Sequence, residues 1–222
     1  MTAARYALYF TAAPGSPLAD FGEAALNGTA PCGFSVEDWR AITAEPRRYG
    51  FHATLKAPFA LAAGVTEDDL RATLRDFAAQ QKPLAPIVLE LAALERFSAL
   101  VPATPSAALD TLAGHVVEVF DSWRAPLSGA DRARRLQAEL SPREREHLER
   151  WGYPYVFEDF RFHMTLAGPI PPEQRDAVDA ALRDLVERHP GCTELHVDGL
   201  TLLAEPERGA AFRVVERAAF SA

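Results

Sequence analysis

Two histidines and two threonines recur in the same short pattern, 111 positions apart. The first pattern, "FHATL", holds His52 and Thr54, and the second, "FHMTL", holds His163 and Thr165. Alternate side chains of a β-strand point to one face, so each histidine shares a face with its threonine. Imidazole exchanges protons near neutral pH, and a hydroxyl can donate a hydrogen bond to a phosphate oxygen. The four side chains therefore predict acid-base chemistry at phosphorus.

Basic side chains lie close to both patterns. Even spacing along an extended strand places Arg48 and Lys56 on the face of His52, and Arg161 on the face of His163. A guanidinium binds phosphate oxygens bidentately, and a lysine supplies a point charge. The chain as a whole is acidic, with a formal net charge of −8, so an anionic substrate needs such a local basic pocket. We expect all three basic residues to bind the substrate.

The composition indicates an ordinary globular protein. Its 222 residues are 48% hydrophobic and 24% charged, which favours a single domain over 1–222. The acidic charge argues against general binding of nucleic acid or of an anionic membrane. No apolar run approaches the length of a membrane span, and the first residues lack a leader pattern. The two cysteines, Cys32 and Cys192, have no metal-binding spacing. We expect a cytoplasmic monomer.

The same elements follow each histidine pattern. Apolar spacing and capping residues predict a helix over 66–81 and a strand over 84–94 after the first pattern. They predict a helix over 171–191 and a strand over 193–203 after the second. A motif, a helix and a strand that match in order indicate an internal duplication.

The duplication predicts how the chain is divided. We expect two similar α/β lobes, roughly 1–103 and 104–222, related by a pseudo-twofold axis that brings both histidine faces to one cleft. An opening strand is predicted over 5–10, with Tyr9 packed in the core. The arginine-rich segment 125–155 is predicted to be loop and exposed helix, and its arginines are interpreted as solvated surface charges.

The paired His-x-Thr patterns resemble those of the 2H phosphoesterase superfamily. The stretches "RYALYF", "AEPRRYGFHATLKAPF", "RFSALVP" and "FRFHMTLAGPI" further resemble its bacterial branch found with phosphonate-utilisation genes, and the resemblance spans nearly the whole chain. It implies a duplicated α/β fold of the α+β type, with mostly antiparallel sheets lining a central cleft and helices outside.

The resemblance also implies an activity. It is that of a metal-independent cyclic phosphodiesterase that needs no cofactor and acts on a small phosphorylated substrate, such as a nucleotide or ribose cyclic phosphate. His52 and His163 would be the general base and general acid, in an order that the patterns do not decide. Thr54 and Thr165 would hold the phosphate.

Two alternatives remain open on the sequence. The same cleft could bind a phosphorylated metabolite without turning it over, although two titratable groups at matched positions exceed what binding requires. The histidines could also be metal ligands together with Asp159, but the chain offers no clear third and fourth ligand at suitable spacing.

Overall fold

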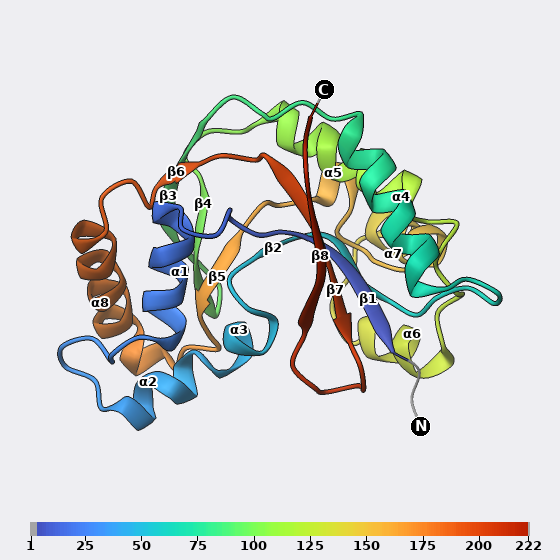
Figure 1. Cartoon of the computed structure of the whole chain (residues 1–222). Coiled ribbons are helices and arrows are strands. Elements are labelled where there is room, and N and C mark those ends of the chain that lie inside the picture. The colour runs from blue at the N-terminus through green and yellow to red at the C-terminus, as the bar shows by residue number, and fades with distance from the viewer. Residues whose placement is uncertain (1–3, 222) are drawn as a thin grey trace.

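Two four-stranded antiparallel sheets form the centre of the molecule (Figure 1). A computed structural model describes residues 4–221. The first sheet has the order β2-β1-β7-β8, and its strands are β1 (Arg5–Phe10), β2 (Ala53–Phe59), β7 (Gly199–Glu205) and β8 (Arg213–Ala219). The second sheet has the order β5-β4-β3-β6, and its strands are β3 (Ile87–Leu94), β4 (Phe97–Pro102), β5 (Met164–Ala167) and β6 (Glu194–Leu195). The expected antiparallel α/β fold is confirmed.

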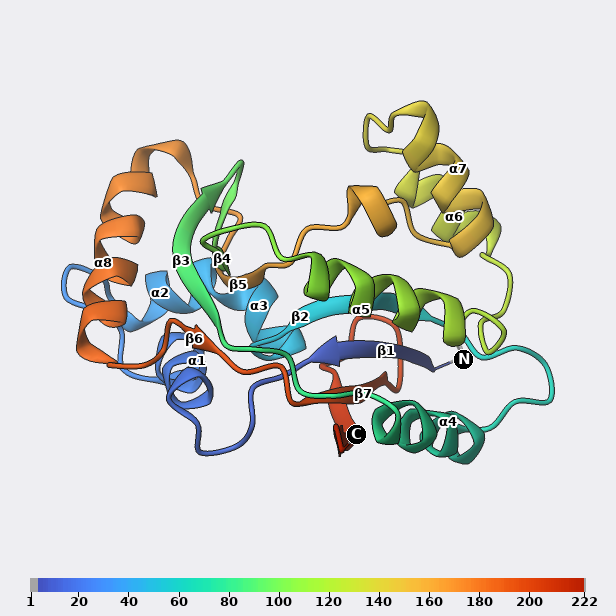
Figure 2. The ribbon, with the colours of Figure 1, turned by 90° about the horizontal axis from the view of Figure 1, so that it is seen from above.

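Helices cover the outside of both sheets (Figure 2). Against the first sheet pack α4 (Glu67–Ala79) and α5 (Ala107–Val119), and against the second pack α1 (Pro17–Asn27) and α8 (Arg175–Arg188). The remaining helices are α2 (Val36–Ile42), α3 (Ala44–Tyr49), α6 (Gly129–Arg135) and α7 (Pro142–Trp151). None of the described helices is long and apolar enough to cross a membrane.

Local sequence signals explain why the helices begin and end where they do. Thr66 caps α4 by accepting a hydrogen bond from the Asp69 N–H, and the Asp69 carboxylate accepts one from the Thr66 N–H in return. Leu70 and Leu74, four residues apart, bury the inner face of this helix. A glycine ends another helix: Gly152 terminates α7 in the left-handed backbone conformation, with a φ of 75°.

The repeats exchange strands. The first repeat runs β1, β2, α4, β3, and the second runs β4, β5, α8, β6, β7. After the helix, β3 of the first repeat pairs with β4 in the second sheet, and β7 of the second repeat pairs with β1 in the first sheet. Each sheet therefore takes strands from both sides of the boundary expected near residue 104, and that boundary does not separate two sheets.

Equivalent positions of the two repeats meet at the centre. Ile87 of the first repeat and Leu195 of the second, which match in the sequence, pair directly as neighbours of antiparallel strands. Contact between two equivalent positions is what a twofold axis generates. The predicted strand 193–203 is interrupted here, because β6 pairs in the second sheet before the chain continues as β7 in the first. The pseudo-twofold axis thus passes between β3 and β6.

Candidate functional site

The strands that carry the two patterns occupy equivalent places. Both β2 and β5 lie at an edge of their sheets, and each pairs with the first strand of its own repeat. Thr54 lies opposite Tyr9 of β1, and Thr165 lies opposite Ala99 of β4. All four predicted histidine and threonine side chains are half-buried. The fold therefore presents both patterns at sheet edges, where a solute can reach them.

Both imidazoles are oriented by the backbone in the same way. The Nδ1 atom of His52 lies 2.8 Å from the carbonyl oxygen of Gly50, and that of His163 lies 2.7 Å from the carbonyl oxygen of Arg161. A carbonyl oxygen only accepts hydrogen bonds, so each Nδ1 carries a proton. In both neutral imidazoles Nε2 is then the basic nitrogen, and it is the one that can accept a proton.

His52 is held in a more enclosed environment than a surface histidine. The ring of Tyr9 stacks on it, with ring centroids 4.0 Å apart, and the Thr54 hydroxyl oxygen lies 3.3 Å from its Nε2. Tyr9 thus combines the predicted burial with a direct contact to the site. Burial lowers the pKa of His52 to about 4, the Gly50 carbonyl opposes this shift, and the charge of His163 adds to it. His52 is therefore neutral at pH 7.

Helix α3 connects the surroundings of the two histidines. His52 and Thr54 line a hollow of about 460 Å³ together with Arg48 and Tyr49 from the end of α3. On its other side, α3 contributes Glu45 and Pro46 to a hollow of about 430 Å³ that contains His163 and Thr165. The two patterns thus face adjoining hollows that share one short helix as a wall.

Lys56 does not share the face of His52. Thr54 pairs with Tyr9 and Lys56 pairs with Leu8, so two steps along β2 match one step along β1. This β-bulge turns Lys56 to the face of Leu8, which points into the core. The prediction from even spacing is wrong for Lys56, because it assumed an uninterrupted strand.

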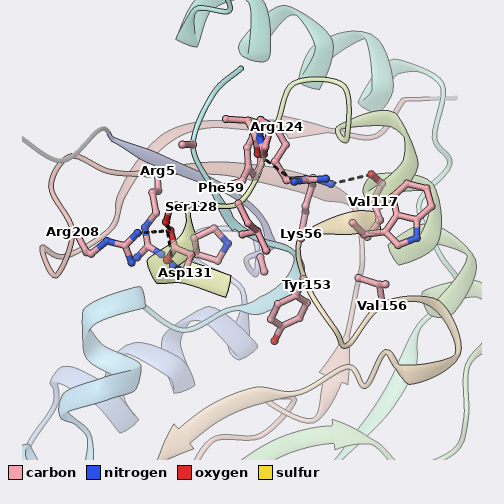
Figure 3. A pocket seen from close by; sticks show the side chains of 18 residues that line it. Arg5, Lys56, Phe59, Val117, Arg124, Ser128, Asp131, Tyr153, Val156 and Arg208 are labelled. Carbon is pink, nitrogen blue, oxygen red and sulfur yellow. Dashed lines mark hydrogen bonds and ion pairs between the residues drawn. The ribbon is translucent and has the colours of Figure 1, made fainter. Parts of the chain in front are cut away.

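The Lys56 ammonium group binds protein groups. It donates hydrogen bonds to the Val117 carbonyl oxygen at 3.0 Å and to the Asp121 carboxylate at 3.2 Å, and Figure 3 shows it reaching towards Val117. Burial lowers the pKa of Lys56 to about 8, and Asp121 opposes this shift. Lys56 lines a separate pocket of about 250 Å³ beside the His52 hollow.

The other two predicted basic residues lie beside the histidines. Arg48 is half-buried in the His52 hollow, where it forms an ion pair with Glu205 and donates a hydrogen bond to the Ala210 carbonyl oxygen at 3.1 Å. Arg161 is exposed and lines a further hollow that includes His163. The guanidinium of Arg161 donates hydrogen bonds to the backbone carbonyl oxygens of Glu158 and Phe160, and it forms no ion pair with a carboxylate among the described residues.

Four more arginines line the His52 hollow, and the sequence did not identify them: Arg5, Arg134, Arg135 and Arg208. Arg134 and Arg135 belong to the segment that was interpreted as a solvated surface. Arg5 and Arg208 are remote from both patterns along the chain, so only the exchange of β7 into the first sheet brings them together. The run "RARR" was the one available signal, and charge runs of this kind are usually exposed.

Asp159, the third ligand in the metal alternative, is engaged elsewhere. Its carboxylate accepts hydrogen bonds from Arg143 at 2.6 and 2.9 Å. Between residues 4 and 221, no three His, Cys, Asp or Glu side chains are grouped so that they could hold a metal ion.

Comparison with known proteins places the chain in a family. A family model described as "Protein of unknown function (DUF1045)" matches residues 54–213, from the first threonine through the second pattern and beyond. The chain belongs to this family. Two curated proteins are similar to this DUF1045 chain, both named ribose 1,5-bisphosphate phosphokinase PhnN.

The identity to both curated proteins extends over nearly the whole chain. The protein from Janthinobacterium sp. (strain Marseille) is 37% identical over 98% of this chain, and that from Laribacter hongkongensis (strain HLHK9) is 38% identical over 95%. These matches take up 51% and 50% of the two proteins, so the chain spans about half their length.

Solved structures also resemble this DUF1045 chain along its length. LigT of E. coli complexed with 3'-AMP is 16% identical, with a TM-score of 0.48 over 98% of both chains. Another solved structure, described as a phosphoesterase, is 15% identical, with a TM-score of 0.44 over the whole of both chains.

Proposed function

We propose that this protein is a metal-independent phosphoesterase that hydrolyses a cyclic phosphodiester. The observation that carries the proposal is the matched orientation of the two imidazoles, each with Nδ1 held by a backbone carbonyl two residues earlier. Hydrolysis at phosphorus requires a proton to be taken from the attacking water and another to be given to the leaving oxygen. Two imidazoles with Nε2 available supply both transfers. The resemblance of the paired patterns to those of 2H phosphoesterases supports this assignment.

In the proposed reaction, Nε2 of His52 takes a proton from water as the water oxygen attacks phosphorus. The bond from phosphorus to one ester oxygen of the cyclic phosphate breaks, and Nε2 of the protonated His163 gives its proton to that oxygen. The product is a phosphate monoester with a free hydroxyl group, and proton exchange with solvent restores both imidazoles. Thr54 and Thr165 donate hydrogen bonds to the non-bridging oxygens, which gain negative charge in the transition state.

The surroundings of the histidines favour His52 as the base. Tyr9 covers its ring, and burial keeps its pKa near 4, so it is neutral and able to accept a proton at pH 7. A proton on His163 would hold His52 neutral more firmly, because like charges that are close together repel. In the proposed starting state, His52 is neutral and His163 carries the proton that it gives to the leaving oxygen.

A phosphorylated ribose is the substrate class that we propose. Relatives of about twice this length are named after a ribose bisphosphate. Their kinase activity is not carried over, because the chain spans only half of them. Their name supports a sugar phosphate, and the resemblance to the phosphonate-associated branch agrees with it. A cyclic phosphate of ribose or of a nucleotide has both the phosphodiester and the sugar.

Turnover of cyclic phosphodiesters in EDTA tests the proposal. The panel comprises 2',3'-cyclic nucleotides and ribose 1,2-cyclic phosphates, with the product measured as a phosphate monoester. We expect turnover in EDTA, and a loss of about 10²- to 10⁴-fold in kcat on His52→Ala or His163→Ala. His196→Ala is the matched control, because His196 is exposed and lies outside both hollows.

Three results would contradict the proposal. Loss of activity in EDTA would favour metal ligation by the histidines. Tight binding of the panel compounds without turnover would favour a binding module for a phosphorylated metabolite. Full activity in the double variant His52→Ala, His163→Ala would place the reaction elsewhere.

A further inference from the structure

The two hollows beside the histidines differ in charge. Five arginines and no carboxylates line the hollow of His52: Arg5, Arg48, Arg134, Arg135 and Arg208. The hollow of His163 and Thr165 has one arginine, Arg96, and one carboxylate, Glu45. Three of the five arginines come from segments outside the duplicated strands and helices. Arg134 and Arg135 are on α6, and Arg208 is on the connection between β7 and β8.

Nearby carboxylates neutralise only part of this positive charge. Glu205 is fully buried behind the hollow and binds both Arg5 and Arg48. Burial alone would raise the pKa of Glu205, but hydrogen bonds from the Gly209 N–H and from the two guanidinium groups lower it below its ordinary value. Glu205 therefore stays ionised at neutral pH, and its single charge leaves one of its two arginines uncompensated.

A second carboxylate is shared in the same way. Asp131 accepts hydrogen bonds from Arg208 at 2.7 Å and from Arg134 at 3.1 Å. Figure 3 shows the neighbouring pocket that Lys56 lines, with Arg208, Arg5 and Asp131 on the same side of it. Asp131 lies in the neighbouring pocket and does not line the hollow of His52. The five guanidinium groups and two carboxylates thus leave a net charge of +3 around the hollow, in a chain with a net charge of −8.

One N–H donor of Arg135 has no hydrogen-bond acceptor within the described residues. Its guanidinium lies over the ring of Tyr153, 4.8 Å from the ring centroid. No carboxylate among residues 4–221 pairs with it, and its Nε is buried without a hydrogen-bond partner. Buried donors in proteins are almost always satisfied, and the side chain of Arg135 lines the hollow, so this unpaired guanidinium is the group there best placed to bind an acidic ligand.

The aromatic residues of the hollow are less available to a ligand than the arginines. Tyr153 is covered by Arg135, and Tyr49 packs against Phe212 with ring centroids 5.1 Å apart. Arg48 also lies over the ring of Tyr49, 5.1 Å from its centroid. A nucleobase would need a free aromatic face on which to stack. The hollow therefore favours an anion over a base.

We propose that the substrate carries a second phosphate, a monoester, which binds at Arg135 with help from Arg134 and Arg208 while its cyclic phosphodiester lies at the two histidines. This inference rests on the proposed function and narrows its substrate class to sugar cyclic phosphates with a terminal phosphate. A guanidinium matches a phosphate bidentately, and a monoester carries more negative charge than a diester at neutral pH. A hollow of about 460 Å³ is within the range that holds a small ligand.

Matched substrate pairs test the second phosphate. The pairs are ribose 1,2-cyclic phosphate with and without a 5-phosphate, and adenosine 2',3'-cyclic phosphate with and without a 5'-phosphate. We expect kcat/KM to be higher for the doubly phosphorylated member of a pair. Arg135→Met keeps a long unbranched side chain and removes the guanidinium charge, and we expect it to reduce this preference by about 10- to 100-fold, mainly through KM.

Arg132→Met is the matched control on the same helix. Arg132 is half exposed, pairs with Glu149 and does not line the hollow, so we expect the preference to stay unchanged. Arg135→Lys restores a charge without the bidentate geometry and should recover part of the preference. If Arg135→Met does not fold, Arg134→Gln replaces it, because Arg134 is more exposed.

Binding of ribose 5-phosphate separates this inference from the proposed function. Calorimetry with the double variant His52→Ala, His163→Ala measures the monoester site without catalysis, and we expect binding that Arg135→Met removes. Binding of this kind without turnover of any cyclic phosphodiester would contradict the proposed function and leave the monoester site standing. Equal kcat/KM within each pair, or no binding of ribose 5-phosphate, would overturn the inference.

Discussion

At the residue scale, two backbone carbonyls decide which nitrogen of each imidazole can act. The carbonyls of Gly50 and Arg161 hold Nδ1 in the same way, so the two histidines begin as chemical equivalents. Their surroundings then distinguish them, because Tyr9 stacks on His52 while Phe97 lies tilted to His163 with ring centroids 5.6 Å apart. The sequence predicted the histidines and threonines because alternation along a strand is local. It could not assign their roles, which depend on rings from other strands.

The pH dependence of the rate follows from these roles. With His52 as base, the rate should rise with pH as His52 loses its proton, around its pKa of about 4, and fall at higher pH where the acid is no longer protonated. His52→Ala should flatten the acid limb, and His163→Ala should flatten the alkaline limb. Profiles of kcat/KM for the two variants check this. Loss of the opposite limb in each variant would mean that the roles are reversed.

At the element scale, one irregularity is repeated in both histidine strands. Thr165 and Ala167 of β5 pair with the adjacent residues Ala99 and Ser98, so β5 has a bulge at the position equivalent to that in β2. Ala167 is fully buried, and its counterpart in β2 is Lys56. The bulge thus limits the site face to the histidine and threonine in both repeats. Sequence spacing could not show this, because a bulge changes the pairing and leaves no pattern of its own.

Helix α1 packs closely against the residue before His52, and a glycine in the helix makes this contact possible. A Cβ atom added at Gly22 would lie 2.1 Å from a ring carbon of Phe51, the residue that precedes His52. Gly22→Ala should therefore move Phe51, lower the free energy of unfolding by about 1–3 kcal/mol and reduce kcat. Urea unfolding and turnover measure the two effects.

Gly114→Ala is the control for the same substitution in a helix. Its Cβ would lie 3.4 Å from Phe157, an ordinary contact, so the gain in helix propensity should leave the protein as stable or more stable by up to about 1 kcal/mol. If both variants lost stability equally, the contact with Phe51 would not be the cause.

At the scale of the whole molecule, the duplication was visible in the sequence and the exchange of strands was not. Both repeats have the predicted order of histidine pattern, helix and strand. Whether that strand returns to its own sheet depends on pairing between distant residues, such as Tyr9 with Thr201. The same pairing brings Arg5 to Glu205, and so it explains why two of the five arginines of the His52 hollow, Arg5 and Arg208, could not be predicted from the sequence.

Separate halves of the chain should not fold. Cutting at the expected boundary leaves each piece, 1–103 or 104–222, with two strands of each sheet. Each would expose strand edges and apolar faces that the other half covers. We expect neither fragment to unfold cooperatively in circular dichroism, and an equimolar mixture to recover native signal. A cooperative transition in one fragment alone would show an independent unit and contradict the single domain predicted from the sequence.

The meeting of Ile87 with Leu195 means that the chain is arranged like a strand-swapped homodimer whose two subunits have been joined by a peptide linker. A true homodimer is bound by its symmetry, because any residue gained at one site appears at the other. Joining the copies removes that restriction. One site can then acquire a basic cluster while the other stays nearly neutral, so a substrate with two different ends can bind in one orientation only.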